Sequence, residues 1–180
     1  GSEGNVGSVK INDSCGLIYL ESDNQCIINF GTSEGADCQT PGYGGAGNTH
    51  ASRTQYWAVN KMKIKSFSYL SGNQWLQDLL LVNVNISPSA FMFCNAFYYG
   101  GEIGFFKSSA NICRNSGEFP GISYHEFGMA LMTMMEMVCQ IHQRHMLVGF
   151  QYLKLTILAR GKDFFMRIAL EMETLAYLAQ

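Results

Sequence analysis

The spacing of apolar and polar positions changes several times along the first 128 residues. Residues 7 to 31 alternate short apolar runs, GLIYL and CIINF, with Gly, Asn and Asp, which predicts β-structure with turns. Residues 32 to 48 are rich in glycine and polar residues and predict a loop. Residues 49 to 70 carry apolar side chains at helical spacing after Thr49, a favourable N-cap, and predict an amphipathic helix.

Three further elements follow this helix. Residues 79 to 86, LLLVNVNI, predict a strand, and residues 95 to 107, NAFYYGGEIGFFK, predict a hairpin that turns at Gly100 and Gly101. Residues 116 to 128, SGEFPGISYHEFG, lead into another helix. The order of strands, helix, strand, hairpin and helix predicts an α+β fold, in which a β-rich N-terminal lobe with a hairpin packs beside helices.

The composition changes abruptly after residue 128. Residues 1 to 128 hold 17 of the 19 glycines and all three prolines, whereas residues 129 to 180 have no proline, asparagine or serine but eight of the ten methionines. We therefore divide the chain into residues 1–128, expected to form a partial catalytic domain, and residues 129–180, an atypical Met-rich helical tail.

Charge and cysteine content limit the functional class. The net charge is −2 with no basic stripe, so we expect no nucleic-acid partner, and no apolar run approaches the ~20 residues of a membrane helix. Of the six cysteines, the first five stand in Gly/Asn/Ser-rich sequence without Cys-x-x-Cys spacing, which favours disulfides and a secreted, extracellular protein over free thiols in a cytosolic one. Asn85, in the triplet Asn-Ile-Ser, fits an N-glycosylation acceptor.

We expect Cys94 and Cys113 to form a disulfide because they bracket the predicted hairpin. Two buried thiols are the alternative for this pair. The pairing of Cys15, Cys26 and Cys38 stays open at the level of sequence.

Three stretches within residues 50–128 resemble one enzyme family. NAFYYGGEIGFF, followed about twenty residues later by GISYHEFG, resembles the core of the thermolysin-like zinc endopeptidases, which include the fungalysins, and ASRTQYWAVNKM resembles the helix that precedes this strand in fungalysin-like enzymes. The resemblance implies a thermolysin-like fold and peptide or protein substrates. It implies that Asn95 and Ala96, on an edge strand, hold the substrate backbone, that His125 is a ligand of a catalytic zinc ion, and that Glu126 is the general base for the zinc-bound water.

The chain departs from the family pattern at the remaining metal ligands. Position 129, where the second zinc histidine belongs, is Met129, and position 144, near the expected third ligand, is Arg144. A thioether is a poor zinc ligand and a cation cannot be one. Since a catalytic zinc takes three protein ligands, we expect this chain neither to hold a catalytic zinc ion nor to hydrolyse peptides.

A reading-frame shift at the junction of Gly128 and Met129 explains both the missing ligands and the change in composition. If one base is lost there, the codons around Met134 to Val138 force the string Asp-Gly-(Asn or Asp)-Gly, an ordinary loop. Met129 then supplies two bases of a histidine codon, and the permitted codons place Glu where Arg144 now stands. We interpret the tail as out of frame and the chain as a truncated metallopeptidase.

Two other interpretations take the tail at face value. Its methionines either line a flexible binding helix or form an ordinary buried stripe. The competing function is therefore a non-catalytic extracellular binding domain that uses the hairpin or the Met-rich tail.

Overall fold

A computed structural model describes residues 6–20, 29–31, 38–39, 43–89, 92–109 and 112–145, with side chains through residue 136. Its sheet has four strands in the order β1-β2-β4-β3. Strand β2 pairs in parallel with both β1 and β4, and β3 pairs antiparallel with β4. Among the described residues the fold is α+β with a mixed sheet and three α-helices, which confirms the predicted class. The strands are β1 (Val9–Asp13), β2 (Leu80–Ile86), β3 (Ala96–Tyr99) and β4 (Glu102–Phe106).

The central strands carry the core because their apolar side chains recur at every second position. Leu80, Val82 and Val84 of β2 are at most 1% exposed, and Ile103 and Phe105 of β4 are fully buried. Period-two alternation directs such side chains to one face of a sheet. The strand predicted over residues 79 to 86 is therefore confirmed.

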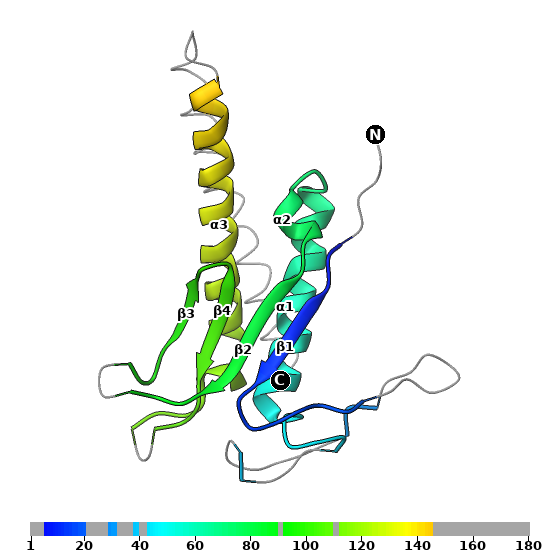
Figure 1. Cartoon of the computed structure of the whole chain (residues 1–180), viewed down its shortest axis with the longest axis vertical. Helices are drawn as coiled ribbons and strands as arrows, with labels where there is room; N and C mark the ends of the chain where they lie inside the picture. The colour runs from blue at the N-terminus through cyan, green and yellow to red at the C-terminus, as the bar shows by residue number, and fades with distance from the viewer. Residues whose placement is uncertain are drawn as a thin grey trace. The chain divides into compact units, whose positions relative to one another are not determined.

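Helix α1 (His50–Tyr69) lies against β1 and β2 (Figure 1). Thr49 caps it as predicted, since the Thr49 hydroxyl accepts a hydrogen bond from the Ser52 N–H at 3.2 Å. Ala58 and Val59 are fully buried in its inward face. The helix predicted over residues 49 to 70 is confirmed.

Lys63, on the same helix, is fully buried, and the sequence gives no sign of it. Its ammonium donates hydrogen bonds to the carbonyl oxygens of Ser8 and Asp78, so it joins α1 to the segments that lead into β1 and β2. Burial lowers the pKa of Lys63, and the Asp78 carboxylate opposes part of that shift. Short helix α2 (Gln74–Gln77) ends at Asp78, which is its C-cap.

The hairpin β3–β4 turns where the two adjacent glycines predict. Gly100 and Gly101 have φ angles of 62° and 89°, and a two-residue turn with positive φ at both positions matches the twist of the flanking strands. The other side of β4 pairs with β2, so β3 is an edge strand among the described residues, as the family resemblance implies.

The predicted β-structure over residues 7 to 31 is only partly present. Residues 9 to 13 form β1, but the run GLIYL at 16–20 forms no strand, and its backbone makes two bonds to a loop, from Tyr19 N–H to Gly44 O and from Gly47 N–H to Leu17 O. Two bonds fix an extended segment without building a ladder. Most of the second run, CIINF, lies outside the described residues.

Helix α3 (Pro120–His145) follows a short 3-10 helix, η1 (Ser116–Glu118). The predicted helix after residue 116 is confirmed. The chain divides into two compact units, residues 1–130 and 131–180. Within the second unit, residues 146–180 of the predicted Met-rich tail lie outside the described residues, and whether the tail is out of frame stays a prediction. No helix among the described residues is long and apolar enough to cross a membrane.

Candidate functional site

The first turns of α3 direct two neighbouring residues into different surroundings. His125 is exposed, whereas Glu126 is only 9% exposed and the next residue, Phe127, is fully buried with its ring 5.3 Å from that of Trp75. Consecutive helical side chains point about 100° apart, so anchoring Phe127 turns Glu126 inward and leaves His125 outward. The predicted general base and the predicted metal ligand therefore do not share a face.

The Glu126 carboxylate meets the edge strand of the sheet. Asn95 O accepts a hydrogen bond from Phe106 N–H, so the alternate residues Ala96 and Tyr98 direct their backbone groups away from β4, to the free edge of β3. A hydrogen bond joins the backbone of Tyr98 to the Glu126 carboxylate. Burial raises the pKa of Glu126, while His125 and this hydrogen bond lower it in part.

The predicted substrate-binding pair lies at the start of this edge strand. Asn95 is exposed, and Ala96 is 6% exposed with its backbone directed outward. A disulfide joins Cys94 to Cys113 with the two Cα atoms 5.6 Å apart, which confirms the predicted bridge. It ties the start of β3 to the segment before η1. A second disulfide, Cys15–Cys38, resolves one pairing that the sequence leaves open.

The residues present do not fit the zinc ion that the family resemblance implies. Met129, one helical turn after His125, is 43% exposed and offers a thioether in place of an imidazole. Helix α3 continues to His145 without the loop that a third ligand would need. In the described part of the chain, no three His, Cys, Asp or Glu side chains could hold one metal ion. The Arg144 side chain lies outside the described residues.

A buried polar cluster around Asp13 was missed by sequence reasoning. The Asp13 carboxylate accepts hydrogen bonds from the Cys15 N–H at 2.7 Å, the Thr49 hydroxyl at 2.7 Å, the Ser52 hydroxyl at 2.5 Å and the Asn85 amide at 3.0 Å. These groups come from β1 and the loop after it, from α1 and its N-cap, and from β2, and no sequence pattern links positions so far apart. The Asp13 cluster therefore fastens the helix to the sheet.

Asn85 belongs to the Asp13 cluster, so its assignment as a glycosylation acceptor is wrong for the folded chain. Its side chain is 1% exposed and its amide donates to Asp13 and Thr49. The Asn85 carbonyl oxygen accepts from the Asn115 amide at 2.6 Å. A glycan on this nitrogen would displace the hydrogen bonds that hold the residue in place.

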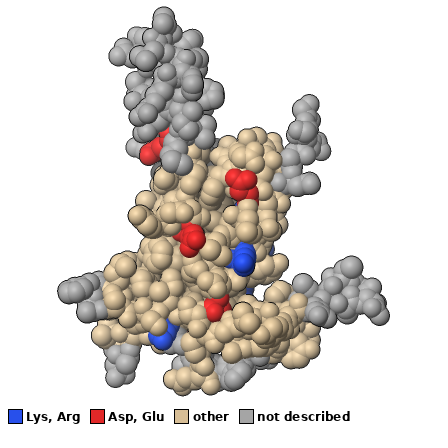
Figure 2. All heavy atoms as spheres, viewed as in Figure 1, with Lys and Arg blue, Asp and Glu red and all other residues tan. Residues whose placement is uncertain are grey.

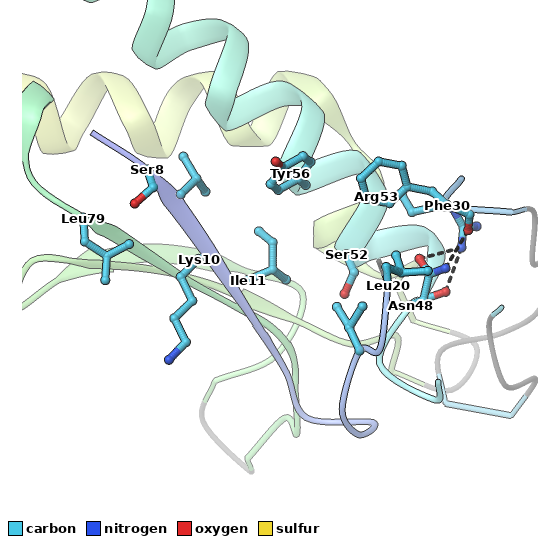
Figure 3. Close-up of a pocket in the computed structure, with 12 residues that line it drawn as sticks. Ser8, Lys10, Ile11, Leu20, Phe30, Asn48, Ser52, Arg53, Tyr56 and Leu79 are labelled. Carbon is cyan, nitrogen blue, oxygen red and sulfur yellow. Dashed lines mark hydrogen bonds between the residues drawn. The ribbon is translucent and has the colours of Figure 1, made fainter. Parts of the chain in front are cut away.

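A cavity of about 360 Å³ opens between β1 and the first turns of α1 (Figure 3). Its walls are mainly apolar, with Ile11 and Tyr56 projecting toward it from strand and helix, and Arg53 lies beside Phe30 at one end. Burial lowers the pKa of Arg53, whose guanidinium donates to Asn48 O at 2.7 Å. Sequence reasoning did not single out this cavity. On the face drawn in Figure 2, Lys, Arg, Asp and Glu side chains are scattered and form no basic stripe.

Comparison with protein-family models, with curated proteins and with solved structures finds no match to this chain. Within the described residues, the class that the structure defines is an α+β fold with a four-stranded mixed sheet and two disulfides.

Proposed function

We propose that this chain is part of a thermolysin-like, secreted zinc endopeptidase that has lost its metal site and does not hydrolyse peptides. The observation that carries the proposal is the hydrogen bond between the β3 backbone at Tyr98 and the Glu126 carboxylate. It brings a His-Glu helix against an edge strand that begins Asn-Ala-Phe, and the family resemblance requires this juxtaposition.

The proposed loss of peptidase activity follows from the missing zinc ligands. A catalytic site of this class takes two histidines and a carboxylate and leaves a fourth position for water. His125 is the one candidate ligand at the expected positions, because Met129 replaces the second histidine and Arg144 stands near the third. The cleft edge of the ancestor is retained in this proposal, while the chemistry is not.

Secretion is part of the same proposal. The two disulfides, Cys15–Cys38 and Cys94–Cys113, support it because such bridges persist in oxidising compartments. Peptide or protein segments are the ligands that the free edge of β3 would take.

Zinc content and cleavage of casein test the proposal on three proteins: the unmodified chain, the double variant Met129→His/Arg144→Glu, and a frame-corrected form with one base inserted at codon 128/129. We expect no zinc and no cleavage for the first protein. The double variant should bind zinc weakly without turnover, since the loop that presents the third ligand is absent. The frame-corrected form should bind zinc stoichiometrically and cleave casein. Stoichiometric zinc and chelator-sensitive cleavage by the unmodified chain would overturn the proposal.

A non-catalytic binding domain is the second candidate. The observation that favours it is the exposed end of the hairpin, where Tyr99 is 81% exposed. Single exposed aromatics are ordinary, but at the tip of a rigid hairpin one can serve as a binding anchor. This candidate gains support if the frame-corrected form also lacks zinc and activity.

A further inference from the structure

The outer edge of β1 carries backbone groups that the sheet does not use. Leu80 N–H donates to Ser8 O and Ser14 N–H donates to Val84 O, so the even-numbered residues of β1 face β2. In a parallel pair the alternate residues face the other way, which directs the N–H and C=O groups of Val9 and Ile11 outward. Among the described residues, no strand pairs with this edge.

The cavity beside α1 lies along this same edge. Val9 and Ile11 form part of its lining, and Ile18, Phe30 and Tyr56 are further apolar residues that line it. In Figure 3, Ile11 and Tyr56 approach the cavity from opposite sides. A sheet edge binds an extended peptide through two features. Its unused backbone groups form hydrogen bonds that give affinity, and apolar recesses beside it select the alternate side chains of the peptide.

The charges along the recess select against a basic ligand. Lys10 and Arg53 are the two charged residues of its lining, and no Asp or Glu lines it. Lys10 is exposed on β1, and in Figure 3 its side chain points away from α1. A residue paired across from Lys10 on an added strand would lie close to the ammonium, and opposite charges at such positions stabilise a sheet.

We propose that the outer edge of β1 binds an extended peptide segment of a partner protein by strand addition. The peptide carries aliphatic side chains at alternate positions, which enter the recess between β1 and α1, and a carboxylate opposite Lys10. This surface is distinct from the β3 edge of the proposed function, because β1 and β3 lie at opposite edges of the sheet.

Labelled peptides test the proposal by fluorescence anisotropy. The probe is fluorescein-TVEVTV-amide, and its two analogues carry N-methyl groups on the odd-numbered or on the even-numbered amides. Only alternate amides of an added strand face β1, so we expect one methylated series to lose binding and the other to retain it. The peptide TVKVTV should bind up to about fivefold more weakly than TVEVTV.

Two protein variants locate the binding. Val9→Pro deletes one outward N–H at the first position of an edge strand, where proline is tolerated, and should weaken binding about fivefold. Ile18→Ser removes an apolar wall and should also weaken binding. Leu17→Ser is the matched control, because Leu17 is 67% exposed and does not line the recess. Circular dichroism and thermal unfolding check that each variant is folded.

Several results would overturn the proposal. They are an absence of TVEVTV binding at about 1 mM peptide, equal effects of the two methylated series, and binding by folded Val9→Pro and Ile18→Ser variants that equals that of the unmodified chain. If TVKVTV bound as tightly as TVEVTV, the part of the proposal that places a carboxylate opposite Lys10 would be wrong.

Discussion

The Asp13 cluster predicts a large loss of stability when its carboxylate is removed. Asp13 is 7% exposed and accepts hydrogen bonds from four donors contributed by the loop after β1, by α1 and its cap, and by β2. In Asp13→Ala those donors lose their acceptor while they stay buried. Ser52 keeps a partner, since its hydroxyl is also 2.7 Å from Gly47 O.

The magnitude follows from the donors that remain without an acceptor. The Cys15 N–H and the Thr49 hydroxyl are the clearest cases, while the Asn85 amide keeps a bond to the Thr49 hydroxyl oxygen at 3.0 Å. An unsatisfied buried donor costs ~1–3 kcal/mol, so two of them lower the free energy of unfolding by about 4 kcal/mol. For a chain of this size, that corresponds to a fall in Tm of roughly 8–16 °C.

Thermal and urea unfolding at neutral pH measure the effect, with Asn12→Ala as the matched control. Asn12 is the adjacent residue of the same strand, but it is exposed and makes one exposed hydrogen bond to Asn83. We expect that variant to change the free energy of unfolding by no more than about 0.5 kcal/mol. A loss below about 1 kcal/mol for Asp13→Ala would refute the reasoning, since it would mean that desolvation of the carboxylate cancels its hydrogen bonds.

Three further predictions follow from the described residues. Replacing both Cys94 and Cys113 by serine should lower the free energy of unfolding by ~3 kcal/mol, because the bridge closes a loop with a sequence separation of 19. Unreduced peptide mass spectrometry should show the linked pair, and Cys94 found free would contradict it. Burial raises the pKa of Glu126, so the folded state holds the carboxyl proton more tightly than the unfolded state does. The contribution of Glu126 to the free energy of unfolding therefore falls as pH rises from the ordinary glutamate pKa toward the raised value. Glu126→Gln should flatten the urea-unfolding profile in that window, and an unchanged profile would exclude Glu126 as its source. Limited proteolysis should cut the tail early and leave a fragment that ends near residues 130 to 150; a tail protected from amide exchange as well as residues 50 to 70 would count against an out-of-frame origin.

Local patterns predict most elements of the first unit. Thr49 and the helical spacing after it specify α1, the alternation in LLLVNVNI specifies β2, and Gly100-Gly101 specifies the hairpin turn. Each of these signals lies within one element, where neighbouring residues decide the conformation. The Cys94–Cys113 bridge also follows, because the two cysteines bracket the hairpin, whereas the edge position of β3 was expected only from the family resemblance.

Features that depend on distant residues could not be predicted. Asp13 and Asn85 are 72 positions apart, and the exposed-looking triplet at Asn85 gives no sign that β1 and α1 bury it. Lys63 is buried for a similar reason: its partners are carbonyl oxygens of Ser8 and Asp78, which carry no side-chain signal. The run GLIYL is apolar enough for a strand, but the backbone available to it comes from a glycine-rich loop.

The directions of the predicted site side chains also could not be predicted without the tertiary structure. The sequence places His125 and Glu126 side by side, but Phe127 packs on Trp75 and turns Glu126 toward the edge strand and His125 toward solvent. The absence of a histidine at position 129 and the change in composition after residue 128 are read from the sequence itself.

The DNA that encodes the junction of Gly128 and Met129 tests the central claim most directly. Independent reads of the genomic sequence across this junction should show one additional base. That base turns the Met129 codon into a histidine codon and restores the loop and the carboxylate farther on. An in-frame ATG at codon 129, confirmed in every read, would contradict the claim that a base is missing at this junction and would favour a binding domain as the function to pursue.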